Sequence, residues 1–150
     1  MRHPLHPALV HFPIASWVLA TALDLVALVW QPALLQPMAA LLIGFGCVAG
    51  LVAAGAGFLD LLKIPEGHPA ERIATIHMSL ALTSWCLYAG SLALRVQGTQ
   101  VAQMHLVAPG PAALALSALG LLVVLATGWL GGSLVYGHGV GVSANEGSLR

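Results

Sequence analysis

Four apolar stretches, each long enough to cross a lipid bilayer, dominate this sequence of 150 residues. A membrane-spanning helix needs about 20 predominantly apolar residues. The stretches that satisfy this length cover residues 8–30, 38–62, 73–95 and 112–136 approximately. Only 7% of the residues are charged, whereas soluble domains carry about 25%. The sequence therefore predicts an integral membrane protein whose spans are helices.

The connections between the four stretches are short and contain proline and glycine, which is typical of helix ends. Short connections make consecutive helices antiparallel neighbours, so we expect an all-α, up-and-down four-helix bundle that forms one domain over residues 1–150. No internal repeat is recognised in the residue pattern. The first stretch exceeds the apolar core of a signal peptide and contains Asp24, so we interpret it as a permanent span.

The lysine and arginine residues indicate how the bundle lies in the membrane. Arg95 falls on one side of the predicted bundle, and the other four fall on the side of the chain ends: Arg2, Lys63, Arg72 and Arg150. Since cytoplasmic loops carry the excess of such residues, this distribution predicts that both termini are cytoplasmic. The net charge is zero, so no basic surface for nucleic acid is expected.

Six of the seven histidines fall on the side of the chain ends, and His105 lies on the opposite side. The six are His3, His6, His11, His68, His77 and His138. His11 and His77 each lie about one turn inside a predicted helix, with small residues at helical spacing beside them. We therefore expect both rings to face each other across one pocket, and His6, which precedes Pro7, to cap the first helix.

A stripe of small residues in the second stretch leads toward Asp60 on the histidine side: Gly46, Gly50, Ala53 and Gly57. On its own such a stripe indicates close packing of helices. Ionisable groups inside a membrane are costly and usually functional, however, and several converge here from different helices. The sequence thus predicts a shared site made by His11, His77 and Asp60, with His138 nearby.

Asp24 is the one charge inside the first stretch that lies away from the histidine side. An unpaired carboxylate at the centre of a spanning helix costs about 2.5–3.5 kcal/mol. We expect Asp24 to contact Arg95, which ends the third stretch on that side, or to be neutral and bonded to Ser91 or Thr21.

Four segments resemble the signature segments of a bacterial membrane family called domain of unknown function 2231. They are HPALVHFPIA (6–15), GAGFLDLL (55–62), IHMSL (76–80) and GWLGGSLVYGHGVGV (128–142). The resemblance implies a four-helix fold in the bacterial inner membrane. Because members are also joined to Rieske iron–sulfur domains, it implies a redox setting. The positions it carries over are His6, His11, Asp60, His77 and the segment 131–136.

The leading hypothesis for function is a b-type cytochrome, in which haem b is held between helices and transfers electrons. His11 and His77 are the expected axial ligands, with His6 or His138 as substitutes. No CxxCH is present, so the haem would not be covalently attached. Its propionates are expected near Arg2, Lys63 or Arg72. A quinone in the lipid bilayer, or a redox protein, is the expected electron-transfer partner.

Two other functions fit the same residues. A zinc, copper or iron ion could be bound by the histidines and the carboxylate, namely His6, His11, Asp60 and His77, with His138 as a further candidate. Alternatively, the chain is a non-catalytic scaffold subunit whose polar groups hydrogen-bond across the bundle, and either form is compatible with a homo-oligomer. No hydrolase or nucleotide-binding motif is found, and no catalytic residue is assigned.

Overall fold

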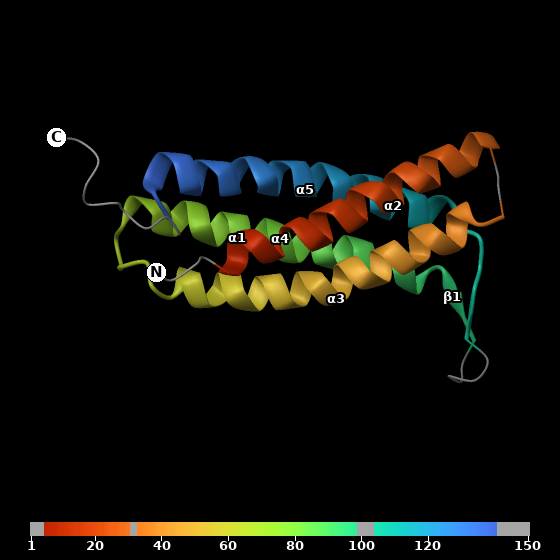
Figure 1. Cartoon of the computed structure of the whole chain (residues 1–150), viewed down its shortest axis with the longest axis horizontal. Coiled ribbons are helices and arrows are strands. Elements are labelled where there is room, and N and C mark those ends of the chain that lie inside the picture. Colours follow the sequence, from red (N-terminus) through yellow and green to blue (C-terminus); the bar gives the residue numbers. More distant parts are fainter. Residues whose placement is uncertain (1–4, 31–32, 99–103, 141–150) are drawn as a thin grey trace.

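The computed structural model describes residues 5–30, 33–98 and 104–140. Its elements are α1 (Leu5–Leu9), α2 (His11–Trp30), α3 (Leu35–Leu61), α4 (Pro69–Ala93), β1 (Val96–Gln97), β2 (His105–Leu106) and α5 (Pro111–His138). The four long helices run side by side and alternate in direction, and α1 lies in the half of the bundle where α5 ends (Figure 1). The predicted all-α, up-and-down four-helix bundle is confirmed, with helix ends within four residues of those expected.

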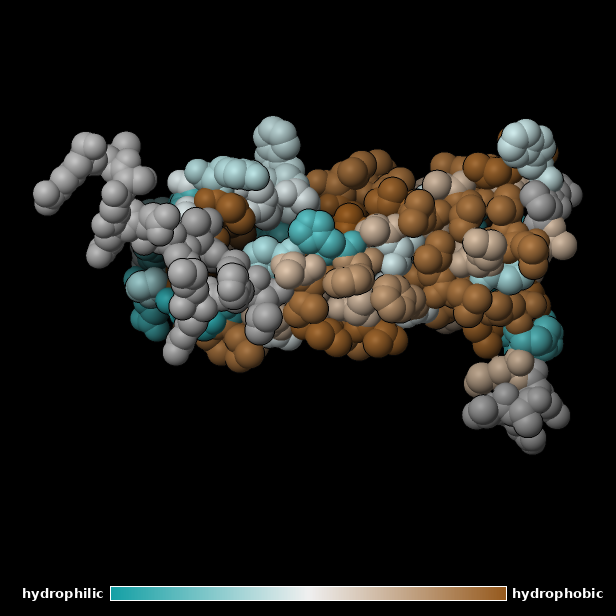
Figure 2. Space-filling model, viewed as in Figure 1, coloured by the Kyte–Doolittle hydropathy of each residue, from teal (hydrophilic) through white to brown (hydrophobic). Residues whose placement is uncertain are grey.

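Among residues 5–30, 33–98 and 104–140, three segments are long and apolar enough to span a membrane: His6–Trp30, Leu35–Leu61 and Pro111–His138. The stretch 73–95, expected as a fourth span, falls in α4 and does not qualify. Helix α4 is of similar length but carries more hydroxyl side chains. Those of Thr75, Ser79 and Thr83 are exposed and donate to carbonyls one turn earlier in α4, which satisfies them without other partners. Hydrophobic residues cover much of the bundle's flank, and hydrophilic residues gather toward the end where α5 finishes (Figure 2).

The first predicted helix is interrupted at Val10, between α1 and α2, although the hydrogen bonds from Val10 N–H to His6 and from Ile14 N–H to Val10 continue across this residue. Pro13 has no N–H to donate to the carbonyl of Leu9, and its ring crowds that carbonyl, which interrupts a helix. The short α1 packs against α3 as well as against α2 (Figure 1). The interruption is local, because His6–Trp30 still forms one segment long enough to span a membrane.

The long helices form a closed ring of neighbours. Helix α2 packs most extensively on α3, and α4 on α5, while contacts between α3 and α4 and between α2 and α5 close the ring. Across the centre, the rings of Trp17 and Tyr88 stack with their centroids 4.8 Å apart. On one side of this stack lies a cavity, and on the other side lies a cluster of polar side chains.

The contacts across the centre recur at constant spacing along the sequence. Trp17 and Tyr88 lie 71 positions apart, and so do Asp24 and Arg95, which form an ion pair. The same spacing separates His6 from His77, whose rings are also neighbours.

The helices that flank these pairs repeat as well, at a spacing of 74. Gly46 of α3 makes room for Trp17, and Gly120 of α5 makes room for Tyr88. The bundle therefore consists of two helix pairs of the same design, related by an approximate two-fold axis along the helices, as in other membrane proteins with parallel repeats. The expectation that the chain has no internal repeat was wrong.

Candidate functional site

A cavity of about 450 Å³ lies between the two helix pairs, on the side of the Trp17–Tyr88 stack that faces α1. Its lining is mostly apolar and comes from every helix. Trp17 forms part of the wall, and the small residues of the predicted stripe, Gly50, Ala53 and Gly57, contribute from α3. These small residues do more than bring helices together, because Gly50 and Gly57 accommodate side chains from other helices.

His6 enters the cavity wall from α1 and is held by α3. Its Nδ1 lies 2.8 Å from the carbonyl oxygen of Ala53. A carbonyl can only accept, so Nδ1 donates, and the neutral ring then keeps its lone pair on Nε2. The ring packs on Gly57, where an added Cβ would lie 2.8 Å from Cε1 of His6. Gly57 therefore provides the space in which this ring sits.

His77 repeats the arrangement in the second helix pair. Its Nδ1 lies 3.0 Å from the carbonyl oxygen of Thr127 in α5, so it too donates from Nδ1 and keeps its lone pair on Nε2. Its ring packs on Gly131, where an added Cβ would lie 3.1 Å from Cε1. Ala53 and Thr127 occupy equivalent positions in the two pairs, and so do Gly57 and Gly131.

The two rings meet across the boundary between the helix pairs. Their centroids are 6.3 Å apart and their planes are nearly perpendicular, at 89°. Both histidines are half-buried and line the cavity. Within the described residues, neither Nε2 atom has a hydrogen-bond partner. Each half of the bundle thus contributes one imidazole with an unpaired Nε2 to the lining of the cavity.

The other candidate residues lie around this pair. His11 lines the cavity, as expected, but its side chain is exposed, and His6 rather than His11 stands opposite His77. Five positions separate His6 from His11, which on a helix turns their side chains about 140° from each other, so when His6 faces His77, His11 lies on the outer side. His6 was expected as a helix cap and instead lies within α1. His3 falls outside the described residues.

Asp60 and His138 have other partners. Asp60 lines the cavity, but Oδ1 pairs with the ammonium of Lys63 at 2.5 Å. The Nδ1 atom of His138 donates to the carbonyl of Ser133 in its own helix, and His138 is not part of the cavity wall. In residues 5–30, 33–98 and 104–140, no three His, Cys, Asp or Glu side chains are grouped so that they could hold a metal ion.

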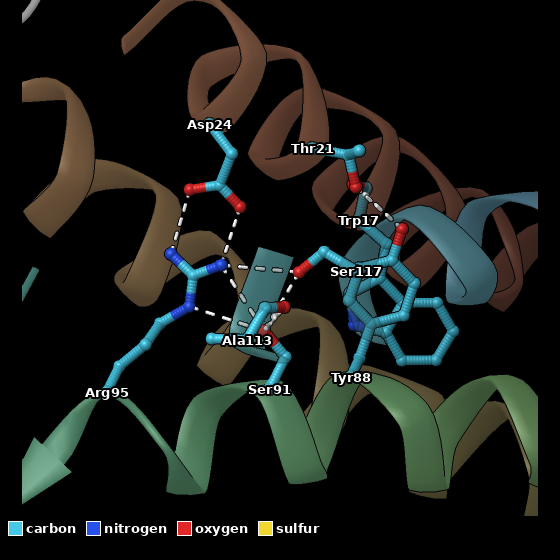
Figure 3. Close-up of polar contacts among 8 residues, drawn as sticks. All are labelled: Trp17, Thr21, Asp24, Tyr88, Ser91, Arg95, Ala113 and Ser117. Carbon is cyan, nitrogen blue, oxygen red and sulfur yellow. Dashed lines mark hydrogen bonds and ion pairs between the residues drawn. The ribbon is translucent and has the colours of Figure 1, made fainter. Parts of the chain in front are cut away.

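A buried polar cluster closes the opposite half of the bundle (Figure 3). Arg95 donates to both carboxylate oxygens of Asp24, at 2.8 and 2.6 Å, and the two side chains are only 1% and 2% exposed. Arg95 also donates to Ser91 and Ser117, and Ser91 donates to the carbonyl of Ala113. The predicted contact between Asp24 and Arg95 is confirmed.

The stack that separates the cluster from the cavity is itself held in place. The hydroxyl of Tyr88 lies 2.8 Å from that of Thr21 and donates to the carbonyl of Trp17 at 3.3 Å (Figure 3). The Nε1 atom of Trp17 is buried against Gly46 and has no hydrogen-bond partner within the described residues. The stack was not predicted from the sequence. A signal for it was present, because Trp17 follows His6 at the same spacing as Tyr88 follows His77.

Comparison with known proteins gives one family. The family described as "Predicted membrane protein (DUF2231)" matches residues 2–144, a range that includes both histidines, the stack and the ion pair. The resemblance drawn from the four sequence segments is thereby confirmed. No curated protein and no solved structure matches the chain significantly.

Proposed function

The chain belongs to the family of predicted membrane proteins DUF2231, and from this premise we propose that it is a b-type cytochrome that binds haem between His6 and His77. The proposal keeps the haem of the leading sequence hypothesis and replaces one of its two axial ligands. His77 remains a ligand, and His6 takes the place of His11.

The separation of the two rings is the observation that carries the proposal. Two metal–nitrogen bonds of about 2.0–2.1 Å, one on each face of a haem, put the centroids of two opposed imidazoles about 6 Å apart. The centroids of His6 and His77 lie 6.3 Å apart. Each Nδ1 donates to a carbonyl, which is how metal-binding histidines are usually oriented and how Nε2 is left free to bind.

The number of ligands favours haem over a bare ion. Haem brings four equatorial nitrogens and needs two axial ligands from the protein. A structural zinc ion needs about four protein ligands, but Asp60 and His138 are engaged elsewhere and His11 lies at the surface. Two imidazoles are therefore all the protein ligands that haem needs, but they are too few for a structural zinc ion.

The shape and lining of the cavity support a flat apolar cofactor. Its volume of about 450 Å³ falls in the range of cofactor sites, and it lies between two helix pairs that each supply one imidazole. Haem also has both propionates at one edge, so they can point along the two-fold axis toward the histidine-rich end. Lys63 and Arg72 are described cations near that end that can pair with them.

The residues of this chain would hold the cofactor and keep water away from it. His6 and His77 fix its orientation, and the indole of Trp17, stacked on Tyr88, shields the cavity from the polar cluster around Arg95. Haem supplies one-electron chemistry when it is bound by two neutral imidazoles. We also propose that both termini are cytoplasmic, because four of the five lysine and arginine residues fall on that side: Arg2, Lys63, Arg72 and Arg150.

Absorption spectra of the detergent-purified protein test the proposal. We expect a Soret band that shifts on reduction, with one haem per chain by pyridine haemochrome. His6→Ala and His77→Ala should each abolish it, whereas His138→Ala, at the same end of the bundle but outside the cavity wall, should leave it intact. A colourless protein with a stoichiometric metal ion, or one with neither, would overturn the proposal in favour of an ion site or a scaffold.

A further inference from the structure

The cavity meets the surface along two sides, which the internal repeat makes equivalent. One side lies between α3 and α4, and the other lies between α2 and α5. A position in α2 corresponds to one 71 residues later in α4, and a position in α3 corresponds to one 74 residues later in α5. The two sides can therefore be compared residue by residue.

The side between α3 and α4 is closed by large side chains. Trp85 of α4 donates from Nε1 to the carbonyl of Cys47 in α3, at 2.9 Å, and so crosses from one helix to the other. Leu82 and Leu51 line the cavity beside it. The hydrogen bond and the indole ring together tie these two helices.

The side between α2 and α5 has smaller residues at the matching positions. Ile14 stands where the other side has Trp85, and the exposed His11 stands where it has Leu82. On α5, Gly128 and Gly132 correspond to Ala54 and Phe58, and an added Cβ at either glycine would meet no atom within 4 Å. This side is therefore less obstructed by side chains than the other, with the imidazole of His11 at its edge, and we call it the mouth.

The mouth lies along α5, a candidate membrane span, and away from the end of that helix. Gly128 is about 15 Å from the end of α5 at His138, at 1.5 Å of rise per residue, and the next residue, Trp129, is an exposed aromatic. A molecule that enters here comes from the lipid phase. His11 forms no hydrogen bond within the described residues, and an unpaired imidazole at this depth is a functional group by default.

We propose that a lipid-soluble hydroquinone reaches the site through the mouth between α2 and α5 and gives a hydroxyl proton to His11. This inference rests on the proposed haem for its redox step. One hydroquinone loses two electrons and two protons and becomes a quinone. Two haem groups, one in each of two protein molecules, would accept the two electrons in succession, and His11 would pass the two protons to water.

Binding of decyl-benzoquinone to the protein in lipid nanodiscs tests the mouth without reference to electron transfer. Gly128→Leu fills the mouth and should weaken binding about tenfold. Gly55→Leu is the matched control, because Gly55 is also an exposed helical glycine with no neighbour within 4 Å but does not line the cavity. Equal affinity of the two variants would overturn the inference.

Single-turnover reduction of the oxidised protein tests His11. His11→Gln keeps a hydrogen-bonding group but is not a base, so it should bind the quinone normally and be reduced about tenfold more slowly by decyl-hydroquinone. Reduction by dithionite should not change. Unchanged reduction by the hydroquinone would overturn the role of His11. A protein without a Soret band whose quinone binding still depends on Gly128 would overturn the haem and the redox step while supporting the entrance.

Discussion

Trp17 and Tyr88 lie face to face across the diagonal of the bundle, with 6° between their ring planes, and each fits against a glycine of the next helix in the chain. The stack occupies the two-fold axis and divides the interior into a half with a cavity and a half filled by polar contacts.

Adding a methyl group beneath the stack should destabilise the bundle. A Cβ at Gly46 would lie 2.5 Å from Nε1 of Trp17, and one at Gly120 would lie 2.8 Å from the ring of Tyr88. Overpacking of this kind costs about 1–3 kcal/mol, so Gly46→Ala and Gly120→Ala should both unfold at lower SDS concentrations than the parent protein. Gly55→Ala, in open space, should not be destabilised, and a loss as large as that of Gly46→Ala would contradict the packing described.

Asp24→Asn should be among the most destabilising conservative changes in the chain. It leaves the Arg95 guanidinium buried without its counter-charge, and breaking a buried pair costs about 3–5 kcal/mol. Asp60→Asn, which breaks the more exposed pair with Lys63, should cost about 1 kcal/mol or less. Both can be measured by reversible unfolding in mixed micelles. The haem spectrum should survive Asp24→Asn, because the ion pair and the cavity lie on opposite sides of the stack.

Gly57→Ala should displace His6 and weaken the site without removing a ligand. The added methyl would lie 2.8 Å from Cε1 of His6, whereas the methyl of Gly131→Ala would lie 3.1 Å from Cε1 of His77. We therefore expect haem occupancy to fall in both variants and to fall further in Gly57→Ala, as measured by pyridine haemochrome. Full occupancy in Gly57→Ala would show that the ring does not need this space.

The two helix pairs should assemble from separate chains. The connection between α3 and α4 is exposed around Glu66 and Gly67, and cuts in such loops are tolerated best. Fragments 1–66 and 67–150 expressed together should co-purify and bind haem, because each supplies one imidazole, one member of the stack and one member of the ion pair. Neither fragment alone should bind it. Haem bound by fragment 1–66 alone would contradict a site shared between the halves.

The helix bundle could be predicted from the sequence, because it is determined by the lengths of the apolar stretches and by the proline-rich connections between them. The sequence was also sufficient for the contact of Asp24 with Arg95, since Arg95 was the one cation assigned to that side. It failed for the partner of His77, because His6 was expected as a helix cap and His11 as the ring that faces inward. Which of two histidines five positions apart on one helix faces α4 depends on how that helix is rotated against its neighbours, and apolar periodicity does not record this rotation.

The internal repeat was not predicted from the sequence, for a different reason. Its central positions are occupied by unlike residues that complement each other, Trp17 with Tyr88 and Asp24 with Arg95. A search for similar residues at equal spacing passes over such pairs. The signal that was present lay in identical residues, since His6 recurs as His77, and Gly46 and Gly57 recur as Gly120 and Gly131.

Asp24 and Arg95 do not enter the membrane at the same time. During synthesis the first helix pair is inserted with a carboxylate that has no counter-charge, at a cost of about 2.5–3.5 kcal/mol, until the end of α4 arrives. A nascent chain that stops after residue 66 therefore keeps an unpaired carboxylate in the membrane. In a pulse-chase experiment, membrane proteases should degrade this fragment faster than the same fragment with Asp24→Ala. The ion pair thus lets the cell distinguish a complete chain from a truncated one.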